Sequence, residues 1–291
     1  MSYQFLKDNR NRASIAGLIC DRLHSRGIGM LKSYYNLSGK INYFIVDNLL
    51  PSTLANEVDI SFPTESQLKF LKENQEQKYV GVNFSKDQSI IEECIYAFQE
   101  PSVINLISEI CSIPELQGDS ELYAGAGVSS MSLGCFLNPH IDNSHDRLKK
   151  SFRRLNLLYY VSRELNSDDG GQLLLYPGGI KSDPISIHSR FNRLVVMRTD
   201  NRSLHAVSKI TSKTAIRKTI SNYYFSTSSP NGHNYYHSTS FRAFPSEPRR
   251  KDLVLRINAA SRSLLKSFTG NFIGRVVNTG LHRGGRNSTD N

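Results

Sequence analysis

The chain has 291 residues, 38% of them apolar, and a formal net charge of +10 at pH 7. This length can bury a full core and allows one or two domains, and no stretch approaches the roughly 20 apolar residues that span a bilayer. Its four cysteines show no Cys-x-x-Cys spacing, which argues against structural zinc and a disulfide framework and leaves a reducing cytoplasm as the default location.

Residues 1–120 are predicted to be mainly helical, with one strand at residues 41–46. The apolar run at residues 13–20 is interrupted by Asp21, so it indicates an amphipathic helix and not a signal peptide. Thr64 to Gln67 has the pattern of a capping box and predicts a helix over residues 67–77. Two further helices are expected, one with an apolar stripe at residues 90–98 and one that begins at Pro101.

From about residue 122 the pattern changes to short strand-like runs separated by Gly, Asn, Asp and Pro. Several short antiparallel strands with such turns are typical of a sandwich or jelly roll. We therefore predict an α+β chain with a mainly β core, a cupin-like double-stranded β-helix with N-terminal flanking helices.

The most informative motif is His140 followed two residues later by Asp142. Residues i and i+2 of a strand lie on the same face, so both side chains converge on one point. His205 and Arg217 follow, each within strand-like sequence. On a strand that begins at Arg217, the hydroxyl residue Thr219 shares its face, whereas Lys218 points the other way and is expected to be solvated.

Two His and one carboxylate on one face of a ferrous ion leave the other face open, as in non-haem iron oxygenases. The open positions can hold a 2-oxo acid and O2, and an Arg fork can bind a distal carboxylate. The residues alone leave two alternatives open. These are a non-catalytic jelly-roll binding module and another metal-dependent enzyme, such as a zinc hydrolase with a three-ligand open site.

With these residues the chain resembles the Fe(II)/2-oxoglutarate-dependent dioxygenases, specifically the prolyl-4-hydroxylase-like branch, over roughly residues 41–228. The resemblance includes the opening at residues 44–51, the segment at residues 154–162 and the turn at Gly170 and Gly171. It implies a dioxygenase that hydroxylates its substrate and releases succinate and CO2. The substrate classes left open are prolyl or amino-acid, natural-product, and glycan or lipid-linked.

The resemblance also implies the ligands and cofactors. His140, Asp142 and His205 would bind Fe(II), and Arg217 with Thr219 would hold the far carboxylate of 2-oxoglutarate, with O2 as the second cosubstrate and ascorbate as an optional reductant. Prolyl hydroxylases usually carry tyrosines nine and three positions before the first ligand His, where this chain has Met131 and Leu137. Tyr159 or Tyr160 would substitute, and we place Tyr160 in the cosubstrate site.

The basic excess lies in the C-terminal tail, because residues 249–291 hold nine Lys or Arg and two Asp, a net charge of +7. We predict three regions: an N-terminal helical extension at 1–40, a dioxygenase domain at 41–248 with its jelly-roll core at about 122–228, and the tail at 249–291. The tail could be a basic amphipathic helix that contacts an anionic membrane surface, or one that packs back on the domain.

No nucleic-acid-binding motif accompanies the pI of about 9.4, so no nucleic acid partner is expected. A cluster of Lys and Arg at residues 147–154 is flanked by acidic residues and is predicted to be a solvated loop. The alternative is that this loop contacts an acidic or phosphorylated substrate near the iron. The expected partner is therefore a small-molecule, peptidyl or glycan substrate.

Overall fold

The computed structural model describes residues 10–81, 84, 89–119, 127–163 and 165–269, with side chains described up to residue 261. The strands, in chain order, are β1 (Tyr43–Asp47), β2 (Lys69–Lys72), β3 (Glu76–Gly81), β4 (Gly127–Met131), β5 (Phe136–Ile141), β6 (Phe152–Tyr160), β7 (Leu173–Leu175), β8 (Ile185–Ile187), β9 (Arg193–Arg198), β10 (His205–Val207), β11 (Arg217–Ser226) and β12 (Ser240–Phe241). The helices are α2 (Arg12–Ser25), α3 (Ile28–Leu37), α4 (Ser52–Ile60), α5 (Ser89–Ala97), α6 (Pro101–Cys111) and α7 (Arg249–Thr269), with short 3-10 helices at η1 (Glu65–Gln67) and η4 (Ser167–Asp169).

The strands form two antiparallel layers joined through β3. The first layer runs β1-β9-β6-β11-β4 and the second runs β5-β10-β7-β8. Apolar side chains of β6 and β9, such as Leu158 and Val195, pack against Leu173 and Ile187 of β7 and β8 in one cluster, so the two layers face each other. This is the predicted double-stranded β-helix.

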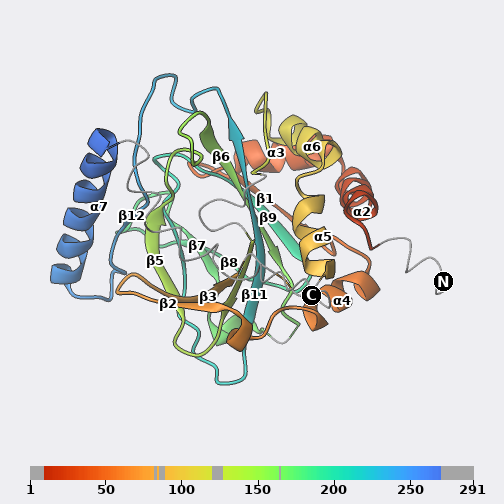
Figure 1. Ribbon diagram of the computed structural model, residues 1–291, viewed down its shortest axis with the longest axis horizontal. Helices are drawn as coiled ribbons and strands as arrows, with labels where there is room; N and C mark the ends of the chain where they lie inside the picture. Colours follow the sequence, from red (N-terminus) through yellow and green to blue (C-terminus); the bar gives the residue numbers. More distant parts are fainter. Residues whose placement is uncertain (1–9, 82–83, 85–88, 120–126, 164, 270–291) are drawn as a thin grey trace, which may run out of the picture.

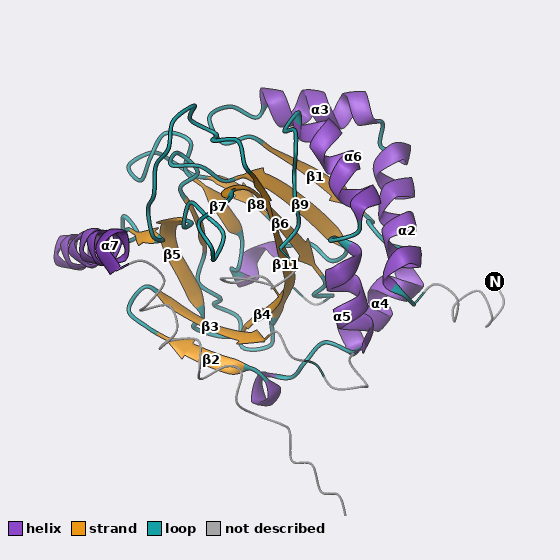
Figure 2. Ribbon diagram, turned by 45° about the horizontal axis from the view of Figure 1, so that its top comes forward, coloured by secondary structure: helices purple, strands orange, loops and turns teal. Residues whose placement is uncertain are grey.

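The helices α2, α3, α5 and α6 cover the outer face of the first layer (Figures 1 and 2). Alternation along β6 explains this, because Leu155, Leu157 and Tyr159 point outward into the main apolar cluster, which includes Ile19 and Ile91 of the helices. The side chains between them point into the barrel. The helical layer therefore supplies most of the apolar core and leaves the barrel interior for the site.

The prediction of a helix over residues 67–77 is wrong. The capping box at Thr64 and Gln67 is present, but it caps only η1, after which β2 and β3 form a hairpin. Phe70 and Tyr79 stack across that hairpin with ring centroids 4.6 Å apart, and β3 pairs with both β4 and β5. Pairing with these two strands joins the two layers of the barrel, and this tertiary requirement overrides the local helical signal.

The C-terminal segment lies on the opposite side of the barrel from the helical layer (Figure 1). Strand β12 pairs with β5, α7 packs against β12, and Leu255 and Ala259 of α7 are buried. Packing back on the domain therefore occurs, while Leu253 and Ile257 are exposed. Membrane contact through this helix stays a prediction, and the predicted apolar positions after residue 269 lie outside the described residues. Within the described part of the chain no helix is long and apolar enough to cross a membrane.

Candidate metal centre

The two histidines of the motif are direct neighbours across two strands. His140 on β5 pairs with His205 at the start of β10, and Asp142 follows the end of β5. The register thus places both rings side by side, with centroids 4.2 Å apart. One backbone pairing thus brings together two residues that lie 65 positions apart in the chain.

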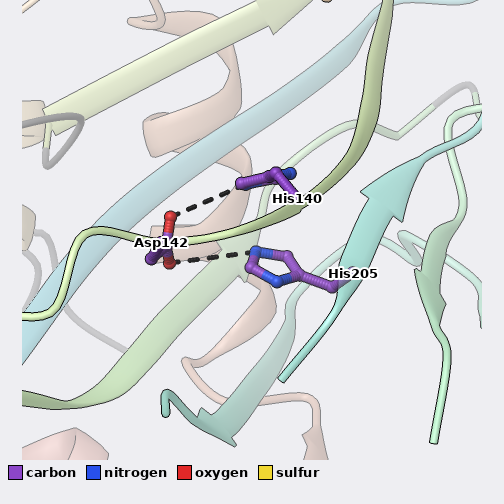
Figure 3. A group of neighbouring side chains, drawn as sticks. All are labelled: His140, Asp142 and His205. Atoms are coloured by element: carbon purple, nitrogen blue, oxygen red, sulfur yellow. Dashed lines mark ion pairs between the residues drawn. The ribbon is translucent and has the colours of Figure 1, made fainter. Parts of the chain in front are cut away.

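The three side chains point toward one centre (Figure 3). His140 Nε2 lies 3.6 Å from Asp142 Oδ1, and His205 Nε2 lies 3.9 Å from Asp142 Oδ2. Their ligand atoms all lie within 4.8 Å of one another, and all three residues are buried. No other such group of His, Cys, Asp and Glu side chains is found among the described residues.

Backbone carbonyls fix the orientation of both rings. The Nδ1 atom of His140 lies 3.0 Å from the carbonyl oxygen of Asn138, and that of His205 lies 2.8 Å from the carbonyl oxygen of Ser203. A carbonyl only accepts hydrogen bonds, so each Nδ1 carries the proton and donates it. Each Nε2 is then left with a lone pair that faces Asp142, which is the arrangement that metal-binding histidines require.

Burial and neighbouring charges set the protonation states of His205 and Asp142. Burial and the neighbouring His140 lower the pKa of His205 to about 4, so that ring is neutral at neutral pH. Burial alone would raise the pKa of Asp142, but the contact with His140 and the charge of Arg153 outweigh it and hold this pKa well below its ordinary value. The centre therefore contains an ionised Asp142 carboxylate and a neutral His205 ring.

Arg217 lies inside the barrel with no carboxylate partner among the described residues. Its side chain is buried, its Nε donates to Ser189 Oγ at 3.0 Å, and its guanidinium carbon lies 4.9 Å from the centre of the Tyr160 ring. Ser189 in turn donates to the carbonyl of Gly171 at 2.7 Å. A buried guanidinium without a counter-charge is costly, which points to an anionic ligand.

Two hydroxyl groups accompany Arg217. Thr219 on β11 pairs with Tyr160 on β6, and the hydroxyl oxygens of both are buried with no hydrogen-bond partner in the described structure. Tyr159, the other tyrosine considered, points to the opposite face and donates to Asn192. Burial raises the pKa of Tyr160, so its hydroxyl stays protonated and can donate. The structure thus brings Arg217, Thr219 and Tyr160 together.

The expected solvation of Lys218 is wrong, because its Nζ donates to Asp59 at 2.8 Å on the outer face of the sheet. The predicted solvated loop over residues 147–154 is also wrong at its end. Arg154 is buried and donates to the carbonyl of Ser228, and Arg153 is only 1% exposed, with Nη1 3.7 Å from Asp142 Oδ2. Both arginines belong to the start of β6 and not to a loop.

The reasoning from sequence missed Ser189, which holds Arg217, and Phe241, whose ring stacks on His140 with centroids 5.2 Å apart. Neither residue lies in a motif or a periodic pattern. The basic cluster at residues 147–154 includes Arg153, and contact of this cluster with an acidic or phosphorylated substrate near the iron is the alternative expected from sequence. His145, His188, His233 and His237, which the sequence left as non-ligands, lie outside the metal-ligand group.

The donor set suits a ferrous ion. Two imidazole nitrogens and one carboxylate oxygen form a three-ligand site that leaves coordination positions open, and the buried Oδ2 atom of Asp142 has no hydrogen-bond partner in the described structure. A 2-oxo acid needs such open positions, and the cationic group with hydroxyls at Arg217 suits its second carboxylate. The residues present therefore fit both groups.

Comparison with known proteins agrees with this chemistry. Residues 126–226 match the model of the 2OG-Fe(II) oxygenase superfamily. This range contains the three residues of the candidate metal group as well as Arg217. No match was found among curated proteins.

Several solved structures are similar to this chain. A prolyl-4-hydroxylase from Pseudomonas putida is 13% identical, covers 68% of this chain and 99% of its own, and has a TM-score of 0.51. A prolyl 4-hydroxylase from Phytophthora capsici is 16% identical, covers 86% of this chain and 77% of its own, and has a TM-score of 0.50. A prolyl hydroxylase from Trichoplax adhaerens is 21% identical, with coverages of 77% and 94% and a TM-score of 0.49.

Proposed function

We propose that this chain, whose residues 126–226 match the model of the 2OG-Fe(II) oxygenase superfamily, hydroxylates a substrate C–H group with Fe(II), 2-oxoglutarate and O2. The observation that carries the proposal is the convergence of His140, Asp142 and His205 in a buried site with two correctly oriented rings. In the overall reaction one oxygen atom of O2 enters the substrate as hydroxyl, and the other enters succinate as 2-oxoglutarate loses CO2.

The three ligands would hold the iron on one face and leave the other face for 2-oxoglutarate and O2. Bound Fe(II) and 2-oxoglutarate together supply the oxidising chemistry. A carboxylate at position 142 favours hydroxylation over halogenation, because it occupies the coordination position that a halide would need. The hydrogen bonds to Asn138 and Ser203 keep both imidazoles oriented throughout.

Arg217, Thr219 and Tyr160 would bind the far carboxylate of 2-oxoglutarate. The guanidinium offers charge-assisted hydrogen bonds, and the two hydroxyls offer further donors that have no other partner in the described structure. Ser189 engages Nε, and Nη1 donates only a weak hydrogen bond, to the sulfur of Met131 at 3.7 Å. The group is buried, so water is excluded from this end of the cosubstrate.

The substrate class that the fold favours is a prolyl residue in a peptide, since structures of prolyl 4-hydroxylases share this architecture. Fold alone is a weak guide to substrate, so amino-acid, natural-product and glycan or lipid-linked substrates stay in the test panel. A binding module or a zinc hydrolase is the alternative class. The chain is expected to act in the cytoplasm.

The deciding experiment adds Fe(II) and then 2-oxoglutarate to the purified protein without oxygen. A visible charge-transfer band from the chelated 2-oxo acid is expected in the wild type. It should be lost in His140→Ala and kept in His233→Ala, which removes an exposed histidine from outside the group. Arg217→Ala should keep the band but require a higher concentration of 2-oxoglutarate. Metal binding without the band would favour the zinc-enzyme or binding-module alternative.

A further inference from the structure

We propose that Arg153 is the anchor of a second anion site, beside the metal centre, which binds a carboxylate or phosphate group of the substrate. This inference rests on the proposed function and extends it, because it names a chemical property of the substrate: an anionic group close to the carbon that is oxidised.

The guanidinium of Arg153 is almost completely enclosed and poorly satisfied. The residue is 1% exposed, and its Nε, Nη1 and Nη2 atoms have no hydrogen-bond partner among the described residues. Its contacts are the face of the Tyr223 ring, 3.8 Å from the guanidinium carbon to the centroid, and the Asp142 carboxylate at 3.7 Å. The Asp142 carboxylate is too far away for a hydrogen bond, so the buried N–H donors are left unsatisfied, which indicates a missing ligand.

The same recess collects other buried polar atoms with unused hydrogen-bonding capacity. It is lined by Asp142, Arg153, Thr199, Asp200, Tyr235 and His237 among others. The hydroxyl oxygens of Thr199 and Tyr235 and the Nε2 atom of His237 lack a hydrogen-bond partner in the described structure. A guanidinium and two hydroxyls are donors, so the group that satisfies them together is an acceptor with several oxygens.

The charge balance of the recess also favours an anion. Asp200 is engaged by two arginines, with its Oδ2 atom 2.9 Å from Arg198 Nε and 3.0 Å from Arg202 Nη2. Asp142 is a proposed iron ligand, so its charge would be balanced by the metal. Neither of the two carboxylates that line the recess is then left to balance the charge of Arg153.

This site is separate from the one at Arg217. Arg153 pairs with Phe225 near the end of β11, whereas Arg217 begins that strand. Eight residues of strand separate the two positions, a backbone distance on the order of 25 Å at about 3.3 Å per residue. One short carboxylate group cannot reach both guanidinium groups, so the two arginines serve different anions.

The outer wall of the recess comes from the segment after β11. Tyr235 and His237 lie there, and the backbone of His237 exchanges hydrogen bonds with Ser144, through N to Oγ at 3.0 Å and from Ser144 N to the His237 oxygen at 3.1 Å. These hydrogen bonds hold Tyr235 and His237 beside Asp142 in the wall of the recess.

The test uses the full-length protein with Fe(II) and saturating 2-oxoglutarate, without oxygen. Acetate and methyl phosphate are titrated as probes, with neutral acetamide as the control, and binding is followed by calorimetry while the charge-transfer band is monitored. Saturable binding of at least one anion, and none of acetamide, is expected. Which of the two binds more tightly distinguishes a carboxylate substrate from a phosphorylated one.

Arg153→Gln should weaken anion binding at least tenfold, whereas Lys150→Gln removes an exposed cation three residues away and should leave it unchanged. Arg153→Lys should restore part of the affinity. If Arg153→Gln fails to form the band, Tyr235→Phe serves instead, because it removes a recess donor that does not contact Asp142. It should keep the band and weaken anion binding several-fold.

Three results would overturn the inference. The first is equal anion affinity in wild type and Arg153→Gln, and the second is no anion binding to a complex that shows the band. The third is loss of the band as the anion binds, which would indicate that Arg153 binds 2-oxoglutarate itself. A wild type without the band would instead contradict the proposed function. In that case the same titration of iron-free protein would test anion binding in the recess independently of the proposed function.

Discussion

The helical layer and the C-terminal segment flank the same barrel, but they are attached by different interactions. Helices α2, α3, α5 and α6 contribute apolar side chains to one cluster with the outer face of the first sheet layer. This cluster contains none of the three residues of the candidate metal centre. The C-terminal segment, residues 240–259, is held largely by polar contacts, and it reaches His140 directly through Phe241.

The polar contacts of the C-terminal segment converge on Asn138, a residue that is fully buried. Its side chain donates to Glu247 Oε2 at 2.7 Å and accepts from Lys251 Nζ at 3.1 Å, and its backbone carbonyl is the acceptor for His140. Arg242 and Asp252 add a bidentate ion pair with distances of 2.8 and 3.0 Å. The comparison indicates that one flank stabilises the fold and the other supports the site.

The largest expected effect is a loss of stability in the helical layer. Ile91 on α5 is completely buried in the main cluster, so Ile91→Ala should lower the free energy of unfolding by about 2–5 kcal/mol. Urea unfolding measures this loss, with the exposed Ile60→Ala as the control. The folded variant should bind Fe(II) as tightly as the wild type. A matching loss of metal affinity would contradict the separation of the two flanks.

The C-terminal segment should show the opposite behaviour. Phe241→Ala removes the ring that stacks on His140, and residues that orient metal ligands typically change metal affinity by about 10–100-fold. We expect a loss of roughly tenfold in Fe(II) affinity. Phe70→Ala, which removes an aromatic ring stacked on Tyr79, is the matched control and should leave metal affinity unchanged. Equal affinities in both variants would show that Phe241 only fills space.

The sequence encodes the site better than its surroundings. The metal group is predictable because a strand places His140 and Asp142 on one face, and the same alternation places Thr219 beside Arg217. The roles of Ser189 and Phe241 arise from contacts between segments distant in the chain, and no local pattern records such contacts. The hairpin of β2 and β3 was missed for the same reason, since its pairing with β4 and β5 outweighs the helical signal after Thr64.

Acid should detach the C-terminal segment before it unfolds the helical layer. The ion pair with Arg242 lowers the pKa of Asp252 below its ordinary value of 3.8. Burial alone would raise the pKa of Glu247, but hydrogen bonds from Lys251 and Asn138 outweigh it and hold this pKa below its ordinary value of 4.5. Both groups bind protons less readily when folded, so their stabilisation is fully present above these ordinary values and is lost as the pH falls through the lowered ones.

Hydrogen exchange of the α7 amides, compared with those of α2, checks this between pH 6 and pH 3. The apolar contacts of α2 do not titrate, and its ion pair between Arg12 and Glu93 is partly exposed, so it contributes little. Protection of α7 should fall first, while α2 stays protected. In Asp252→Asn the protection of α7 should already be weaker at pH 7, and the acid effect should shrink. Simultaneous loss of protection in both helices would show that the segment unfolds only with the whole domain.

The smallest expected effect is at an ion pair in the helical layer. Arg12 on α2 binds Glu93 on α5 through Nη2 at 2.9 Å, but the Arg12 side chain is 43% exposed. Exposed pairs contribute about 0–1 kcal/mol, so Glu93→Gln should change the free energy of unfolding by less than about 1 kcal/mol and leave Fe(II) affinity unchanged. Glu93→Gln and Asp252→Asn each convert one paired carboxylate to an amide, yet only the second belongs to contacts that end at His140. A difference in metal affinity between these two variants would therefore be attributable to position, because the chemical change is the same.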